Sequence, residues 1–312
     1  MSVTDEQHEI DEAEGHDVAG APGVIAAPHG EAGAGEPSGG GGRVRHLLSS
    51  AAPPLVVFVL FLIAWQVMSR QVVTRDNDRG DFLMAPPGDV WSEAFADGDN
   101  LAEALGGLWV TGRVTIIGLV LAIVLGVGAA VLMSQASWVE RSFYPYAVVL
   151  QTIPIIALVP LIGVATDYGM NGRILVCIII SFFPIVTNTL FGLRSAEQGH
   201  HDLFTLHGAG RGTRLRKLMF PAALPAMFTG FRIAAGLSVI GAIVGDFFFR
   251  RGEKGIGQWL YVYQQNLQTS QLYGAIFWSS LFGIVMFWSF GLLGDLLTRS
   301  WHDSTSAGGR TG

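Results

Sequence analysis

The side chains best suited to act on another molecule lie in one polar, basic stretch at residues 202–225, DLFTLHGAGRGTRLRKLMFPAALP. Gly208 can end a short helix there, because glycine reaches the left-handed conformation at little steric cost. Pro221 and Pro225 stand at the start of the next apolar run, where proline suits a first helical turn. The spacing predicts two short helices joined at an elbow, a shape suited to docking a soluble partner. The second arm carries Arg211, Arg214, Arg216 and Lys217.

The titratable residues do not indicate catalysis. His200, His201 and His207 are interpreted as polar loop residues, since no acid, serine or cysteine stands beside them at a catalytic spacing. The single cysteine, Cys177, lies in an apolar run, so neither an intrachain disulfide nor a cysteine-based zinc site is possible. The sequence holds no Gly-x-x-x-x-Gly-Lys-[Ser/Thr] phosphate loop. We therefore expect no catalytic residue, no metal and no cofactor.

The composition points to a protein that crosses a membrane several times. Half of the residues are hydrophobic and only 14% are charged, against about 25% charged in soluble domains. Residues 1–46 form an acidic tail rich in Gly and Ala, which we expect to be disordered, as we do residues 302–312. This tail accounts for the net charge of −6, so no nucleic-acid partner is indicated. The remaining 47–301 form the predicted membrane domain.

Six apolar stretches are each long enough, at about 20 residues, to span a bilayer. Strands of alternating pattern are absent from the sequence, so the expected fold is an all-α bundle of about six transmembrane helices. Basic residues favour a cytoplasmic location for both ends of this domain, with the strongest weight at 194–220. The expected spans lie near 51–69, 108–133, 143–165, 173–193, 222–248 and 272–297.

A few polar residues and prolines inside these spans are candidates for a solute path. Prolines in the third span remove backbone hydrogen bonds, which is tolerable where neighbours or a water-lined cavity satisfy the freed groups. Polar side chains in a bundle either hydrogen-bond across helices or line a solute path, and the sequence leaves both roles open. The candidates are Gln151, Thr152, Pro154, Pro160, Ser181, Thr187, Asn188 and Ser238.

Charged and aromatic residues near the outward ends of the spans are expected to act at the membrane surface. We expect Asp246 to be an interfacial anchor, paired at helical spacing with Arg250 or Arg251. In the outward segment 82–95, Asp89 is expected to cap a short helix. The segment 255–269 offers three aromatic residues either for interfacial anchoring or for contact with an extracytoplasmic protein: Trp259, Tyr261 and Tyr263.

The polar stretch resembles the cytoplasmic coupling loop of ATP-binding-cassette importer permeases, which reads Glu-Ala-Ala, three residues, Gly, then a spacer and Leu-Pro. Gly208 and Pro221 match the glycine and the proline, and Asp202 takes the acidic position. Leu203 and Phe204 replace the two alanines, a departure that changes how deeply the loop seats in a partner. Further matches carry the resemblance from about 82 to 301: Arg113, Gly118, Gly126, Pro154 to Leu161, Pro221 to Pro225 and Gly230 to Arg232. The likeness is to permeases of the nitrate, sulfonate, taurine and thiamine-precursor group.

The resemblance implies a type I importer permease in the bacterial cell membrane, surrounded by lipid. It implies a separate ATP-binding-cassette ATPase subunit, an extracytoplasmic solute-binding protein and a second copy of this chain as partners. It also implies a coupling loop at about 194–221, with Asp202 capping the first helix and the following residues in the docking surface: Leu203, Phe204, Leu206, His207, Gly208, Ala209, Leu215 and Pro221.

Three alternatives remain beside that reading. A secondary carrier or channel working without ATP would often show internal repeats and midplane charges, and the sequence shows no clear repeat. A membrane-embedded enzyme would need clustered His, Asp, Glu or Ser residues, which the spans do not offer. An assembly scaffold without flux of its own is distinguished only by transport data.

Overall fold

A computed structural model describes residues 41–75 and 84–302, and within these ranges every regular element is helical. The predicted all-α class is confirmed for this part of the chain. Residues 1–40 and 303–312, which make up most of the two predicted tails, lie outside the described residues. By its internal contacts the chain divides after Leu55, and everything below concerns the unit that begins at Val56.

Five helices are long and apolar enough to cross a membrane among the described residues. They are α1 (Gly41–Arg75), α4 (Gly98–Gln135), α7 (Met170–Leu193), α10 (Phe220–Phe248) and α12 (Thr269–His302). The shorter elements are α3 (Pro87–Val90), a π-helical turn (Trp91–Ala96), α5 (Ser137–Thr152), α6 (Ile155–Thr166), α8 (Gln198–Leu206), α9 (Arg211–Arg214), a second π-helical turn (Leu215–Met219) and α11 (Ile256–Gln265).

The third expected span is broken. Helices α5 and α6 meet at an angle of 101° instead of forming one straight helix over 143–165. Ile153 and Pro154 between them have extended backbone conformations. The cause is local, because Pro154 has no N–H to continue the α5 hydrogen bonds and disfavours a helical residue before it. The bundle therefore has five continuous spans, or six if the broken pair counts as one.

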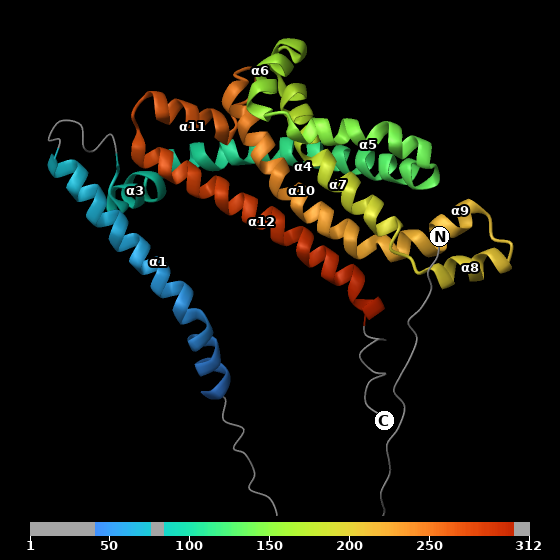
Figure 1. Cartoon of the computed structure of the whole chain (residues 1–312). Coiled ribbons are helices and arrows are strands. Elements are labelled where there is room, and N and C mark those ends of the chain that lie inside the picture. The colour runs from blue at the N-terminus through green and yellow to red at the C-terminus, as the bar shows by residue number, and fades with distance from the viewer. Residues whose placement is uncertain (1–40, 76–83, 303–312) are drawn as a thin grey trace, which may run out of the picture. The chain divides into compact units, whose positions relative to one another are not determined.

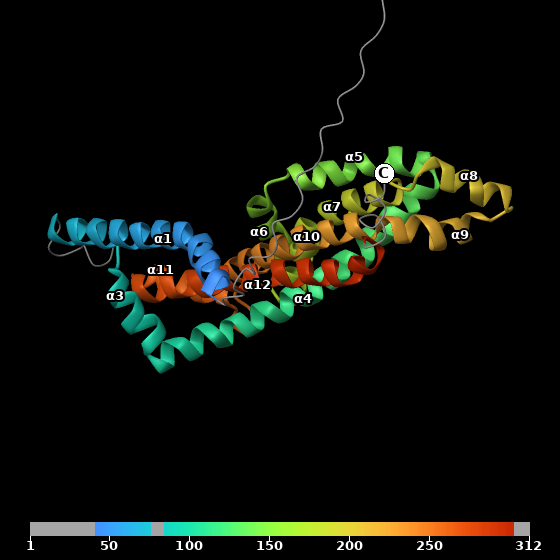
Figure 2. The same cartoon turned by 90° about the horizontal axis from the view of Figure 1, so that it is seen from below.

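Helices α7 and α10 form the centre of the bundle, with α4 against α7 and α12 against α10 (Figures 1 and 2). Their shared core includes Val186, Leu190, Met227 and Ala234, all fully or almost fully buried. Helices α4 and α7 approach closely at Gly118, since a Cβ there would collide with Cys177. No such close approach occurs at Gly128 or Gly236, where a Cβ would meet nothing closer than 3.9 Å.

The segment that leads into α4 begins differently from the prediction. Asp89 is not a helix cap, because α3 already starts at Pro87, two residues earlier. The capping aspartate is Asp97, whose side chain accepts hydrogen bonds from the backbone N–H groups of Asp99 and Asn100, each at 3.0 Å. An aspartate in this position satisfies amides that the first helical turn leaves without partners. This cap fixes the start of the 38-residue α4.

Candidate functional site

The polar stretch folds into an elbow, residues 198–219, that projects from one end of the bundle (Figure 1). Its first arm is α8, and its second arm is α9 with the π-helical turn that continues into α10. Gly208 has φ +63°, and the N–H of Ala209 donates to the Phe204 carbonyl at 2.9 Å. The predicted glycine turn is confirmed. Arg214 Nη2 donates to Thr205 Oγ1 at 2.8 Å and so ties the two arms together.

The elbow exposes apolar side chains that nothing in the described chain covers. The side chain of Leu206 is 85% exposed and that of Leu203 is 49% exposed, whereas Phe204 is half-buried. Leu215 faces the other way and packs against the core of the bundle. An exposed leucine pair at the tip of a rigid turn is a surface suited to a protein partner.

The other predicted residues of the elbow take less prominent positions. Asp202 does not cap α8, because that helix already begins at Gln198; its carboxylate instead accepts from the Gln198 side chain at 3.4 Å. His207 lies at the C-cap, with Nδ1 3.0 Å from the Leu203 carbonyl. Ala209 is half-buried after the turn, and Pro221 lies in the first turn of α10.

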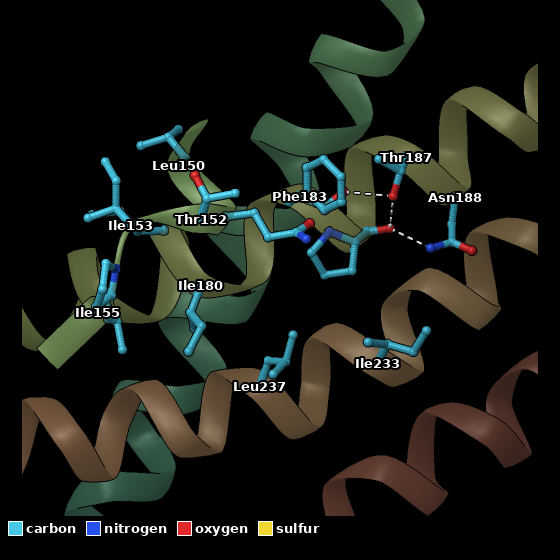
Figure 3. A pocket seen from close by; sticks show the side chains of 14 residues that line it. Leu150, Thr152, Ile153, Ile155, Ile180, Phe183, Thr187, Asn188, Ile233 and Leu237 are labelled. Carbon is cyan, nitrogen blue, oxygen red and sulfur yellow. Dashed lines mark hydrogen bonds between the residues drawn. The ribbon is translucent and has the colours of Figure 1, made fainter. Parts of the chain in front are cut away.

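A cavity of about 630 Å³ opens where the broken pair α5–α6 meets α7 and α10 (Figure 3). Fourteen residues line it, and five of them are among the predicted path residues: Gln151, Thr152, Pro154, Thr187 and Asn188. These come from segments more than thirty positions apart in the sequence and converge because α6 turns back at the break.

The remaining predicted path residues lie elsewhere. Ser181 and Ser238 are fully buried and donate across helices, to the Ala234 carbonyl at 3.1 Å and the Thr115 carbonyl at 3.2 Å. Both therefore hold the bundle together, one of the two roles that the sequence left open. Pro160 lies inside α6 with an exposed side chain and does not line the cavity.

A buried ion-pair network lies near the other end of α10. Arg173 Nη1 of α7 lies 3.0 Å from Asp246 Oδ1 of α10, and both side chains are 2% exposed or less. Thr111 Oγ1 of α4 donates to the same carboxylate and accepts from the Ile256 N–H at 2.9 Å. The network thus joins α4, α7 and α10 to the start of α11, and it balances two charges that neither water nor lipid solvates.

Arg173 also fixes the connection between α10 and α11. Its guanidinium donates to the backbone carbonyls of Phe249 at 2.9 Å, Arg251 at 2.9 Å and Glu253 at 3.0 Å. Five planar donors suit one guanidinium for several acceptors at once. A side chain of α7 therefore fixes three carbonyls of the loop that connects α10 to α11.

The predicted pairing of Asp246 with Arg250 or Arg251 was wrong, as was its position at the interface. Helix α10 ends at Phe248 and Phe249 is extended, so the following residues leave the helical spacing. Arg250 stacks on the Tyr261 ring at 4.1 Å, and Arg251 pairs with Asp167 at 2.5 Å. Asp246 therefore pairs with Arg173 instead.

The aromatic residues of α11 are packed more deeply than expected. Tyr263 is buried and stacks with Trp259, their ring centroids 5.6 Å apart. Burial, and secondarily the nearby Glu103 carboxylate, raises the pKa of Tyr263 to about 12. Its hydroxyl therefore stays protonated and donates to Glu103 Oε2 at 3.3 Å. The anchoring prediction was wrong for Tyr263, which belongs to a core cluster with Ala104 and Ile256.

Comparison with known proteins agrees with this architecture. A solved structure titled "Inward facing conformations of the MetNI methionine ABC transporter" matches with a TM-score of 0.56 and 18% identity, over 65% of this chain and 98% of that one. At this identity the match shows the fold alone. It is the fold of the ABC importer permeases.

Sequence comparison assigns the family. The family described as "Binding-protein-dependent transport system inner membrane component" matches residues 122–303. The formylaminopyrimidine transport permease protein ThiX of Halalkalibacterium halodurans is 31% identical over 249 residues, 79% of this chain and 95% of that protein. The bicarbonate transport system permease protein CmpB of Synechocystis is 28% identical, over 75% of this chain and 84% of that protein.

This chain therefore belongs to the family of binding-protein-dependent transport system inner membrane components. It is a multi-pass membrane protein of a family of transport subunits. The resemblance drawn from the elbow motif is confirmed at the level of the family.

Proposed function

We propose that this chain forms the solute pathway of an ATP-binding-cassette importer and couples it, through the elbow, to an ATPase on a separate subunit. The observation that carries the proposal is the exposed Leu203 and Leu206 on a rigid glycine turn, joined directly to the central helix α10. Movement of a partner seated on this tip would be passed to α10 and so to the cavity between α7 and α10. Family membership supports the same role.

The proposal has three further parts. Solute reaches the cavity from an extracytoplasmic binding protein, and two copies of the chain work together. The elbow and both ends of the membrane domain face the cytoplasm. The four basic residues in the second arm of the elbow are in keeping with this orientation. Closure of the paired ATPases draws the two elbows together and switches the bundle from inward-open to outward-open.

Purification tests the coupling role directly. The tagged chain is extracted from its native membranes in mild detergent, its partners are identified by mass spectrometry, and ATP hydrolysis is measured. We expect an ATP-binding-cassette subunit to copurify, and to be lost from a variant carrying Leu203→Ser and Leu206→Ser. Leu161→Ser is the matched control, because Leu161 is also exposed but lies on α6, away from the elbow. Equal recovery of the ATPase from all three proteins would contradict the proposal.

An ATP-independent carrier is the second candidate, and one observation favours it. The pair α5–α6 is a broken helix beside a cavity, an arrangement that secondary carriers use at their binding sites. A chain that purifies alone in several detergents and takes up solute in ATP-free proteoliposomes would establish the carrier and exclude the coupled importer.

A further inference from the structure

The cavity carries no formal charge. Its fourteen lining residues include no Asp, Glu, Lys, Arg or His. Arg232, the single basic residue of α10, is turned toward α12, where its guanidinium lies 4.1 Å from the centre of the Phe287 ring. A charged solute would lose its water in this cavity without gaining a counter-charge, which is costly in apolar surroundings.

Three polar side chains of the cavity already donate to backbone carbonyls of their own helices. Thr152 Oγ1 donates to the Val149 carbonyl and Thr187 Oγ1 to the Phe183 carbonyl, each at 2.9 Å. Asn188 Nδ2 donates to the Pro184 carbonyl at 2.8 Å (Figure 3). A hydroxyl has one hydrogen but two lone pairs, so both threonines offer acceptors to a solute, as does the amide oxygen of Asn188.

The backbone around the cavity adds to this excess of acceptors. Pro184 has no N–H to donate to the carbonyl of Ile180, a lining residue one turn earlier in α7. At the break, the last carbonyls of α5 meet the first amides of α6, so the partial negative charge of one helix end offsets the partial positive charge of the other. Free side-chain donors come mainly from the amide of Gln151.

We propose that the cavity accepts a small solute that has no negative charge and presents N–H groups from a flat, apolar body, as an aminated nitrogen heterocycle does. Its N–H groups would donate to Thr187 and Asn188, while Phe183 and the isoleucines of the lining would pack against its ring. The cavity volume lies within the range typical of small-molecule sites. The inference rests on the proposed role of the cavity in transport. An inorganic oxyanion needs a counter-charge, and the lining offers none; the free side-chain donors of the lining are the amides of Gln151 and Asn188.

Equilibrium binding tests the solute class independently of ATP hydrolysis. The probe is 4-amino-5-hydroxymethyl-2-methylpyrimidine. Its binding to the chain, held with its native partners in lipid nanodiscs, is measured by saturation-transfer NMR. A ligand control is 5-hydroxymethyl-2-methylpyrimidine, which lacks the amino group. We expect the aminated probe to bind several-fold more tightly than this control and nitrate not to displace it.

Two threonines provide a matched pair of variants. Thr187→Val removes an acceptor in the cavity and is expected to weaken binding of the aminated probe about threefold to tenfold. Thr229→Val removes a hydroxyl that donates to the Pro225 carbonyl at 3.0 Å in the same way, but outside the cavity, and is expected to change nothing.

Three results would overturn the inference: displacement of the probe by millimolar nitrate, equal binding of the aminated and unaminated pyrimidines, or no binding of the aminated probe up to about ten millimolar. None of these results bears on whether the elbow binds an ATPase. Conversely, an elbow variant that still copurifies with the ATPase would overturn the coupling role without changing these affinities.

Discussion

The elbow and the ion-pair network lie at opposite ends of α10, roughly 40 Å apart along the helix axis, since Asp246 follows Met219 by 27 residues. Arg173 in the network has four acceptors and almost no exposed surface, and together with Thr111 and Asp246 it joins four helices. In the elbow Leu206 is 85% exposed, and a single side-chain bond, from Arg214 to Thr205, joins the two arms. The difference indicates that the network serves the internal stability of the chain, whereas the elbow presents the exposed apolar tip that the proposed docking of a partner requires.

The largest effect is expected from breaking the ion pair. Arg173→Met leaves the buried Asp246 carboxylate uncompensated, which costs about 3–5 kcal/mol. We expect most of the protein to be lost as aggregate, measured by size-exclusion chromatography after heating in detergent. Adding Asp246→Asn removes the unpaired charge and should recover much of the folded fraction. Arg216→Met, at an exposed position of the elbow, is the matched control. An Arg173→Met protein as heat-resistant as the parent would refute this role.

Glycine substitutions compare the packing of the two regions. A Cβ on Gly257 would lie 2.7 Å from Asp246 Cβ and 2.8 Å from the Phe247 nitrogen, whereas a Cβ on Gly212 of the elbow meets nothing within 4 Å. Gly257→Ala is therefore expected to destabilise the fold by about 1–3 kcal/mol. Gly212→Ala should be neutral or slightly stabilising, because alanine favours a helix over glycine. Thermal denaturation of both variants in one detergent measures the difference, and equal midpoints would contradict it.

The turn of the elbow depends on the backbone at Gly208. Its φ of +63° is strained for a β-branched residue, so Gly208→Val should cost about 1–3 kcal/mol locally and misplace the tip of α8. Asparagine tolerates this conformation, so Gly208→Asn should keep the elbow. Because nothing packs within 4 Å of this position, the exposed elbow can rearrange to relieve the strain, so we expect Gly208→Val to lose the copurifying ATPase while the thermal midpoint stays near that of the parent. Retention of the ATPase by the valine variant would show that the turn does not position the tip.

The smallest effect on stability is expected at the tip itself. Leu206→Ser should change the free energy of unfolding by less than about 0.5 kcal/mol, because the side chain buries little surface. Its effect on ATPase affinity should nevertheless reach roughly five- to thirtyfold, as for a residue central to an interface. Titration of the purified ATPase against the chain measures that affinity. If Leu206→Ser lowered the stability and left the ATPase affinity unchanged, the tip would serve the fold of the chain and not the binding of a partner.

Features set by local sequence could be predicted from the sequence. The apolar runs gave the spans, because length and hydropathy alone decide whether a helix can cross a bilayer. The turn at Gly208 and the proline at the start of α10 follow from conformational preferences of single residues. Even the break in the third span had its signal in the backbone hydrogen bond that Pro154 removes, although the sequence alone did not predict a bend of 101°.

Features that depend on pairing between distant helices could not be predicted. Arg173 and Asp246 are 73 positions apart, and nothing in the sequence states that α7 and α10 bring them within 3.0 Å. The signal that existed was an arginine at the start of one apolar span and an aspartate at the end of another, charges that must find partners once buried. The cap predicted at Asp202 failed for a related reason, because the start of α8 is uncertain by several residues from sequence alone.

The most direct test of the central claim is the distance between the elbows of two copies. The chain's one cysteine, Cys177, is buried, so Arg216→Cys, at an exposed position of the elbow outside the leucine tip, introduces a single accessible labelling site. Spin labels on this site, in the complex purified with its ATPase, report the separation by pulsed electron paramagnetic resonance. The proposed coupling predicts that the separation shortens when ATP is trapped and returns after hydrolysis. A separation that is the same with and without ATP, in a complex that still hydrolyses it, would contradict the account.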